Sequence, residues 1–315
     1  MERVGLVSMT NYILRRLLIA IPTILAISLI TFIAGYLSPS DPITIMLGDK
    51  GDPATVERVK HEYGLDKPLW EQYLSSVWNA LHGNLGLSFF YRGWPIADMF
   101  KQGLPITARL GLTAALLGVS LGIILGVVSA IKRGTWVDKL AMFISLLGIS
   151  IPSFVLAPIL IIILAMNLHL VPVAGWGKPE NYVLPALVLA ARPLSLIARI
   201  TRSSMLDVIR QDYIRTARAK GLGERVVIYK HALKNALIPV LTVTGMTLGD
   251  LLTGSFIVET IFNVPGIGRA SITSIYQRDY PVIQATTLMY AVTFVMMNLI
   301  VDLLYTLVDP RIRYS

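Results

Sequence analysis

The sequence has no cysteine and no motif of a known catalytic site. Without cysteine, the chain forms neither disulfides nor thiolate metal sites. Its four histidines are scattered, without the spacing of metal ligands. Neither a G-x-S-x-G nucleophile motif nor a G-x-x-x-x-G-K-[ST] phosphate loop occurs. The sequence therefore predicts no enzyme, no metal site and no cofactor in this chain, so any ATP chemistry must come from another chain.

Charged residues are also scarce. They make up 15% of the chain, and hydrophobic residues make up 54%. Soluble domains contain about 25% charged residues, so the composition indicates a protein that crosses a membrane several times. We expect its spans to be helices and its fold class to be all-α.

Six apolar segments approach the length of about 20 residues that a spanning helix needs. Two arginines precede the first, whose apolar run is too long for a signal peptide and predicts an uncleaved anchor. Pro152 and Pro158 predict a bend in the third. Arg192 and Pro193 interrupt the fourth, which is also short. The predicted spans are about 17–37, 106–131, 140–167, 183–200, 236–258 and 282–308.

Basic residues gather on one predicted face of the membrane. They lie before the first span, in 132–139, in 199–235 and after the last span, whereas 38–105 is slightly acidic. Because basic loops stay in the cytoplasm, we expect both termini inside. The net charge of +9 then reflects orientation and gives no support to nucleic-acid binding. Residues 1–105 would form the first span and an extracytoplasmic loop, 106–308 a transmembrane domain, and 309–315 a cytoplasmic tail.

The extracytoplasmic loop carries helical signals. Asp52 and Pro53 predict a helix start, and Gly64 predicts its stop. Farther on, apolar residues recur at helical spacing and form one stripe: Trp70, Leu74, Val77, Trp78 and Leu81. This stripe would lie on the lipid interface, pack on the protein's own spans, or dock an extracytoplasmic partner.

Two patterns lie inside the spans. Small residues at Gly118, Gly122 and Gly126 predict close helix packing, within the chain or against a second copy or homologue. Arg192 and Asp250 are charged groups deep in their spans, where an ionisable residue is a functional candidate. Either they form a buried structural pair, or they line a polar translocation pathway.

The loop 201–235 has a helical, basic pattern that Gly221 and Gly223 interrupt. A lipid-binding basic helix would explain the charge. It would not require two helices joined by glycines, which are better suited to transmit force to a cytosolic partner.

The segment "YIRTARAKGLGERVVIYKHALKNALIP" closely resembles the cytoplasmic loop of ABC importer permeases of the dipeptide/oligopeptide/nickel family. The stretches "GLDKPLWEQYLSSVWNALHGNLGLSF", "LPITARLGLTAAL" and "ETIFNVPGIGRASITSIYQRDYPVIQA" resemble the same family in the same order. Its general loop motif has glutamate and two alanines before a glycine. Aligned on Gly221, those positions are Arg215, Thr216 and Ala217, so the last alanine and the glycine match.

The resemblance implies a type I permease with six spans in a prokaryotic cytoplasmic membrane. It also implies a second homologous permease, two cytosolic ATPase subunits that bind ATP and Mg²⁺, and an extracytoplasmic binding protein. Peptides are the implied cargo, ahead of nickel complexes and oligosaccharides. The rivals are an ion-coupled secondary transporter that works as a single chain and a membrane-anchored structural or signalling protein. The residues implied to couple to the ATPase are Tyr213, Arg215, Thr216, Ala217, Arg218, Ala219, Lys220, Gly221 and Glu224.

Overall fold

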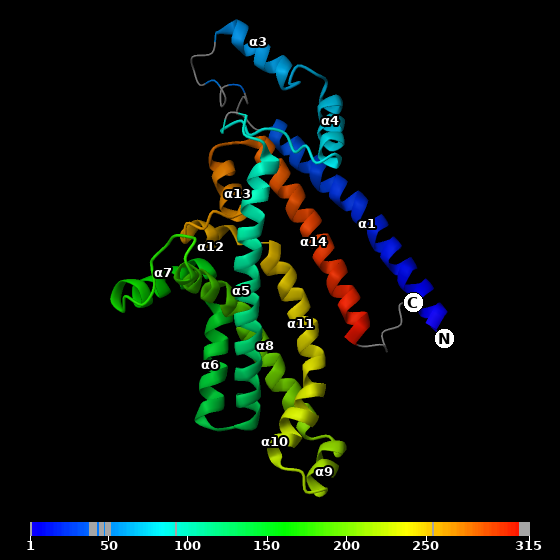
Figure 1. Ribbon diagram of the computed structural model, residues 1–315, viewed down its shortest axis with the longest axis vertical. Helices are drawn as coiled ribbons and strands as arrows, with labels where there is room; N and C mark the ends of the chain where they lie inside the picture. The colour runs from blue at the N-terminus through cyan, green and yellow to red at the C-terminus, as the bar shows by residue number, and fades with distance from the viewer. Residues whose placement is uncertain are drawn as a thin grey trace. The chain divides into compact units, whose positions relative to one another are not determined.

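The computed structural model describes residues 2–37, 43, 47, 52–91, 93–253 and 255–308 (Figure 1). The described residues are mainly helical, and the extended pairing among them is an isolated bridge between Leu87 and Pro95. This confirms the all-α prediction. The predicted tail 309–315 and parts of the predicted loop 38–105 lie outside the described residues.

The chain divides into two compact units. One comprises Met1–Thr107 and Pro265–Met296, and the other comprises Ala108–Val264 and Met297–Ser315. Helix α5 (Ile96–Ile131) and helix α14 (Tyr280–Val308) each contribute residues to both units.

The first unit contains α1 (Glu2–Tyr36), α3 (Pro53–Glu62), α4 (Leu69–Leu81) and α13 (Ile267–Tyr276). Asp52 caps α3 by accepting a hydrogen bond from the Thr55 backbone N–H at 3.3 Å, as the sequence predicts. Gly64, just beyond the end of α3, has a φ of +64°, which glycine adopts without strain.

Most of the apolar stripe of α4 is exposed. Trp70, Leu74, Trp78 and Leu81 are exposed, Val77 is half-buried, and α4 has no fully buried residue. Packing on the protein's own spans therefore accounts for only part of this stripe, and the lipid interface and a partner stay as candidates for the rest.

Asp279, before α14, fixes the end of the predicted loop 38–105 within the first unit. Its buried carboxylate accepts hydrogen bonds from the Ser88 hydroxyl and from the backbone N–H groups of Phe89 at 3.0 Å and Phe90 at 3.2 Å. A buried carboxylate needs such donors because burial removes its hydration.

The second unit follows the order α6 (Trp136–Ser150), α7 (Ser153–Leu160), α8 (Val183–Ile209), α9 (Asp212–Ala219), α10 (Glu224–Val226), α11 (Leu233–Thr253) and α12 (Phe256–Ile261). Two π-helical stretches extend the helices, Ile161–Asn167 after α7 and Val227–Ala232 between α10 and α11. A short 3₁₀ turn, Pro179–Tyr182, leads into α8.

The described residues contain five helices long and apolar enough to span a membrane, or six when a bent pair counts as one span. That pair consists of α6 and the helix Ser153–Asn167, which meet at 115°. The predicted third span, 140–167, is therefore broken and not one continuous helix. The break falls at Pro152, which has no backbone N–H and directs the residue before it away from helical geometry.

Several helix ends differ from the predicted spans. Helix α8 continues through Ile209, so the predicted end at 200 lies inside it. The reason is that Ile197, Thr201 and Met205 are buried at helical spacing, and the basic residues between them do not interrupt that face. Helix α5 begins ten residues before the predicted 106, and α11 ends at Thr253 instead of 258.

The predicted glycine run packs against α8. A Cβ on Gly118, Gly122 or Gly126 of α5 would lie 2.9, 2.8 or 2.5 Å from atoms of α8, closer than atoms approach. A Cβ on Gly148 of α6 would likewise lie 2.8 Å from the Ala191 carbonyl oxygen of α8. Small residues on two neighbouring helices thus let α8 approach both closely.

Candidate coupling site

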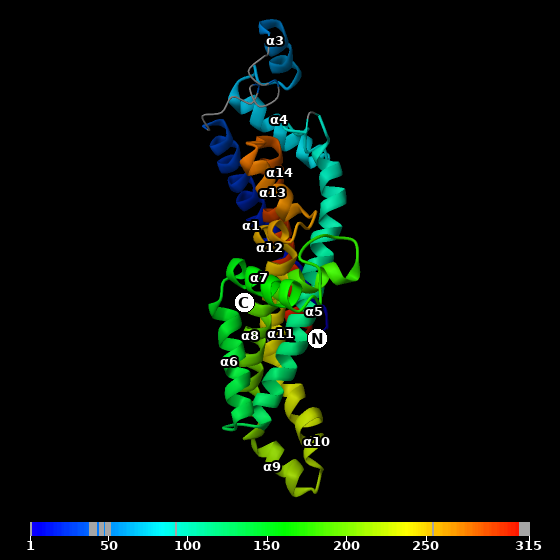
Figure 2. The ribbon, with the colours of Figure 1, turned by 90° about the vertical axis from the view of Figure 1, so that its left-hand side faces the viewer.

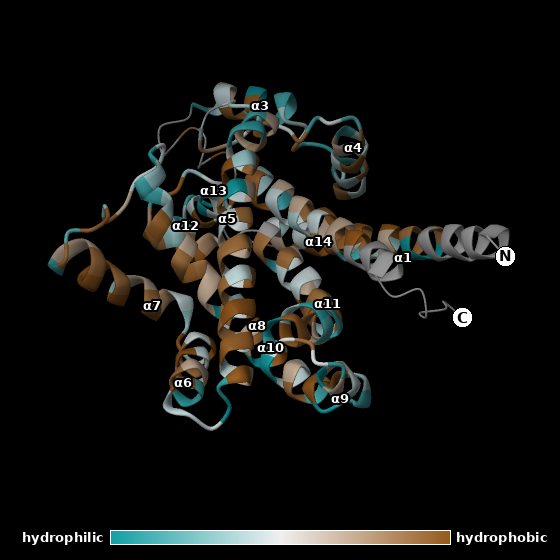
Figure 3. Ribbon diagram, turned by 60° about the horizontal axis from the view of Figure 1, so that its bottom comes forward, coloured by the Kyte–Doolittle hydropathy of each residue, from teal (hydrophilic) through white to brown (hydrophobic). Residues whose placement is uncertain are grey.

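The predicted coupling loop forms an elbow of two short helices after α8. Helix α9 lies beyond the end of α8, and α10 continues through the π-helical stretch into α11 (Figures 1 and 2). The helical part of the predicted loop 201–235 thus includes the last turns of α8, and the exposed elbow itself spans 210–226. Hydropathy colouring of the ribbon shows the hydrophilic residues of this elbow beside the apolar spans (Figure 3).

Gly221 ends α9 with a complete Schellman motif. Its backbone N–H donates to Arg218 O at 2.9 Å, and the N–H of Leu222 donates to Ala217 O at 3.4 Å. Gly221 has a φ of +77°, in the left-handed region that this motif requires. The glycine therefore sets the direction in which the chain leaves α9.

The inner face of α9 is part of an apolar core. Ile214 and Ala217 lie against Met205 of α8 and against Val227 and Ala232 beyond the elbow. Val127 and Ala130 of α5 belong to the same core. This packing ties the elbow to the ends of three spanning helices, so α9 cannot move independently of them.

The position of Ala217 corrects one expectation. A small residue on the apolar face of α9 is expected to press into a groove of a partner, but Ala217 is 7% exposed and faces this chain's own helices. The apolar side of a short surface helix packs first against the apolar surface of its own chain. A partner would therefore contact the opposite side of α9.

That opposite side is exposed and basic. Arg215, Thr216 and Ala219 lie on this side, and Tyr213 and Lys220 are exposed at its edges. Arg215 pairs at 3.7 Å with Asp212 one turn earlier. Tyr213 also accepts a hydrogen bond at 2.8 Å from Asn235 Nδ2. Three apolar side chains beyond Gly221 extend the surface: Leu222, Val226 and Tyr229.

An ion pair closes the elbow. The Arg218 guanidinium donates from Nη2 to Glu224 Oε1 at 2.7 Å and from Nε to Oε2 at 3.1 Å. These hydrogen bonds raise the pKa of Arg218. Because both side chains are partly exposed, the pair contributes about 1 kcal/mol or less to stability. Its two-point geometry holds α9 and α10 at a defined angle.

A second ion pair, which sequence reasoning missed, holds the helix that leads into the elbow. Asp138 of α6 accepts from Arg202 of α8, from Nε at 2.7 Å and from Nη2 at 2.8 Å. The Ser129 hydroxyl of α5 and the Gly134 N–H also donate to Asp138, which is buried. The signal in the sequence was a single acidic residue within an otherwise basic loop. The cluster, here called the Asp138 clamp, fixes α5, α6 and α8 to one another.

The intramembrane charges do not meet. Arg192 of α8 and Asp250 of α11 are both exposed in this chain, and no ion pair joins them in the part that the structure describes. The structural pair thus gains no support, and the pathway role of these residues stays a prediction. Among the described residues, no three His, Asp or Glu side chains are grouped as a metal ion would need.

Two family models match this chain. The first, "Binding-protein-dependent transport system inner membrane component", matches residues 122–314. The second, the N-terminal membrane component of the same kind of system, matches residues 9–110. The chain belongs to this family. It is an ABC importer permease of the peptide/nickel type, a multi-pass protein of the cytoplasmic membrane and a transport component, not a catalytic one.

Characterised relatives match this permease over nearly its whole length. The glutathione transport system permease protein of Escherichia coli O6:H1 is 42% identical and covers 98% of this chain and 100% of its own. The dipeptide transport system permease protein of Lactococcus lactis is also 42% identical, over 97% of this chain and 100% of its own.

Solved structures share the fold. The permease resembles a chain of the MetNI methionine ABC transporter in inward-facing conformations, with a TM-score of 0.56 and 19% identity. The match covers 67% of this chain and 96% of the other. An amino acid ABC transporter chain matches with a TM-score of 0.53 and 18% identity, over 66% of this chain and 93% of its own.

Proposed function

We propose that this permease imports di- and oligopeptides by alternating access, driven by ATP hydrolysis in two cytosolic ATPase subunits. A second, homologous permease would complete the pathway, and an extracytoplasmic binding protein would deliver the peptide. Both termini would lie in the cytoplasm, on the side of the basic elbow. The proposed division keeps 1–105 as the first span with its loop and 106–308 as the transmembrane domain.

The elbow carries this proposal. It joins an exposed basic surface on α9 to a core shared with α5, α8 and α11, and the Schellman motif and the Arg218–Glu224 pair fix its shape. A cytosolic subunit that binds Arg215, Thr216, Ala219 and Lys220 would therefore pull on spanning helices and not on a loose loop. Arg192 and Asp250 would line the pathway that these helices open and close.

The cargo proposal rests on the relatives. They are named for dipeptide and for glutathione transport, and both cargoes are short peptides. The two relatives described above do not name nickel complexes or oligosaccharides. An ion-coupled transporter working as a single chain is disfavoured, because the family is binding-protein-dependent.

Reconstitution of all subunits in vesicles tests both parts. We expect uptake of a labelled dipeptide that requires ATP inside and loaded binding protein outside. Uptake without ATP would refute the coupling to ATP hydrolysis. ATPase activity that nickel complexes stimulate but no peptide does would refute the peptide cargo.

A charge reversal tests the surface of α9. Arg215→Glu should weaken ATPase binding, whereas Lys178→Glu should not, although both side chains are 77% exposed. Equal effects of the two changes in a pull-down of the ATPase would argue against α9 as the contact.

A further inference from the structure

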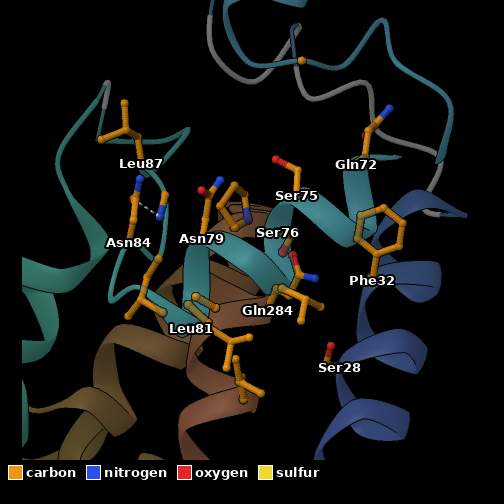
Figure 4. Close-up of a pocket in the computed structure, with 18 of the residues that line it drawn as sticks. Ser28, Phe32, Gln72, Ser75, Ser76, Asn79, Leu81, Asn84, Leu87 and Gln284 are labelled. Carbon is orange, nitrogen blue, oxygen red and sulfur yellow. Dashed lines mark hydrogen bonds between the residues drawn. The ribbon is translucent and has the colours of Figure 1, made fainter. Parts of the chain in front are cut away.

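A cavity of about 550 Å³ lies within the unit formed by Met1–Thr107 and Pro265–Met296. Its walls come from α1, from α4 and the turn before it, and from the first half of α14 (Figure 4). The volume is within the range of about 300–1,000 Å³ that small-molecule sites occupy. Neither the elbow nor the predicted pathway residues line it.

The two ends of the cavity differ in chemistry. Ile21 and Leu25 of α1 and Leu288 and Val292 of α14 line one part with hydrocarbon. In the part next to α4, uncharged polar side chains lie among apolar ones such as Val77 and Leu81. The polar ones are Ser28, Gln72, Ser75, Ser76, Asn79, Asn84 and Gln284 (Figure 4). Lys67 is the one charged residue among the described lining residues, and it is basic. This arrangement suits an amphiphile with a hydrocarbon chain and an anionic headgroup.

The cavity lies beside a span that is largely exposed in this chain. Ile21 and Leu25 are exposed, and only 11% of the apolar window of α1 is buried. We expect lipid to cover the part of this span that a second permease leaves free. From Ile21 to Phe32 the helix rises about 16 Å, close to the depth of one leaflet of a hydrocarbon core about 30 Å thick. Exposed Trp70 and Trp78 place α4 at headgroup level, where tryptophan is favoured.

Contacts between α1 and α4 build the polar rim into the fold. The Tyr73 hydroxyl lies 3.1 Å from both the Leu25 carbonyl and the Ser28 hydroxyl, and its ring packs on Phe32 with centroids 5.4 Å apart. Gln72 Nε2 donates to Lys67 O at 2.8 Å, which fixes the turn that carries the lysine. The rim is therefore held in place whether or not the cavity is filled.

We propose that this cavity is a phospholipid site. One acyl chain lies along α1 between Ile21 and Phe32 and against Leu288 of α14, and the anionic headgroup lies at Lys67. The bound lipid replaces the missing side-chain contacts between α1, α4 and α14, and so holds the first span to the rest of its unit. This inference does not depend on the cargo or on the coupling role of the elbow.

A photoreactive lipid tests it in the complete transporter purified into nanodiscs. The probe is a phosphatidylglycerol with a diazirine at the end of one acyl chain, and the labelled residues are mapped by mass spectrometry. Because the diazirine is at the end of the chain, labelling should concentrate at the deep end of the cavity, on residues 21–25 and 288–292. Leu288→Trp should fill the cavity and reduce this labelling about tenfold, the effect of removing about two buried methylenes. Met296→Trp, an exposed position two turns farther along α14 that does not line the cavity, should leave it unchanged.

The headgroup part has its own control. Lys67→Glu should reduce labelling by the phosphatidylglycerol probe more than labelling by the matching phosphatidylcholine probe. Lys60 lies outside the lining, so Lys60→Glu should leave labelling by both probes unchanged. Labelling spread evenly over the exposed face of α1 and insensitive to Leu288→Trp would overturn the proposal. A disulfide between a cysteine introduced at Val292 and a cysteine introduced in a spanning helix of the second permease would also overturn it, because a protein helix would then occupy the cavity.

Discussion

Replacing Gly221 by alanine should uncouple transport without damaging the membrane domain. The Gly221 backbone has a φ of +77°, and a Cβ there would meet no atom within 4 Å. The whole penalty is therefore backbone strain, about 1–2 kcal/mol for a residue other than glycine in the left-handed region. This strain would lower the ratio of elbows with an intact Schellman turn to elbows without it by a factor of about 5 to 30.

Gly223 provides a matched control two residues away. A Cβ on Gly223 would also meet nothing within 4 Å, but its φ of −61° and ψ of 143° are open to any residue. Gly223→Ala should therefore leave the elbow intact, and by restricting the unfolded chain it should stabilise it by a few tenths of a kcal/mol up to about 1 kcal/mol.

The assay is ATPase activity stimulated by loaded binding protein, measured with peptide uptake in reconstituted vesicles. Gly221→Ala should lower both several-fold, whereas the amount of assembled permease and its thermal unfolding should remain near wild type, because the elbow lies outside the spans. Equal loss in both alanine variants, or full coupling in Gly221→Ala, would refute the argument that the left-handed turn sets the elbow.

Three further changes separate the roles of individual residues. Ala217→Trp should overpack the core under α9 by about 1–3 kcal/mol and lower the unfolding temperature of the complex; loss of ATPase binding with unchanged unfolding would place Ala217 at the partner instead. Asp138→Leu should cost about 3 kcal/mol by leaving Arg202 unpaired, and adding Arg202→Leu should recover part of it, which thermal unfolding of both variants would reveal. Arg192→Leu should abolish uptake while the complex still assembles; lost assembly that Asp250→Leu restores would favour the structural pair.

The helical, membrane-spanning fold follows from composition and from runs of apolar residues. A span must be apolar along its whole length in the bilayer. Hydropathy therefore locates six segments but does not mark the residues at which each helix begins and ends. The prolines of the third span predict a bend, but its angle of 115° depends on how α7 packs against α8 and α12, which no local pattern encodes.

The glycines predict the elbow, because the left-handed turn at Gly221 is a local property of the backbone. Long-range partners were not predicted. The Asp138–Arg202 pair joins residues 64 positions apart, and the orientation of Ala217 depends on helices α5 and α8 that a pattern within α9 cannot show. For the same reason the glycine run of α5 predicts close packing without naming α8 as its partner.

The π-helical stretch Val227–Ala232 has a consequence for the direction in which the elbow faces. A π turn accommodates one residue more than an α turn, and each residue of an α-helix advances the chain by about 100° around the axis. The elbow residues just before Val227 are therefore rotated by about that angle from where an uninterrupted α11 would set them. The azimuth of the docking surface is thus encoded inside a spanning helix, in the number of its residues and not in their chemistry. The loss of one residue there would turn the basic face of α9 away from the proposed cytosolic partner while every side chain on that face stayed the same.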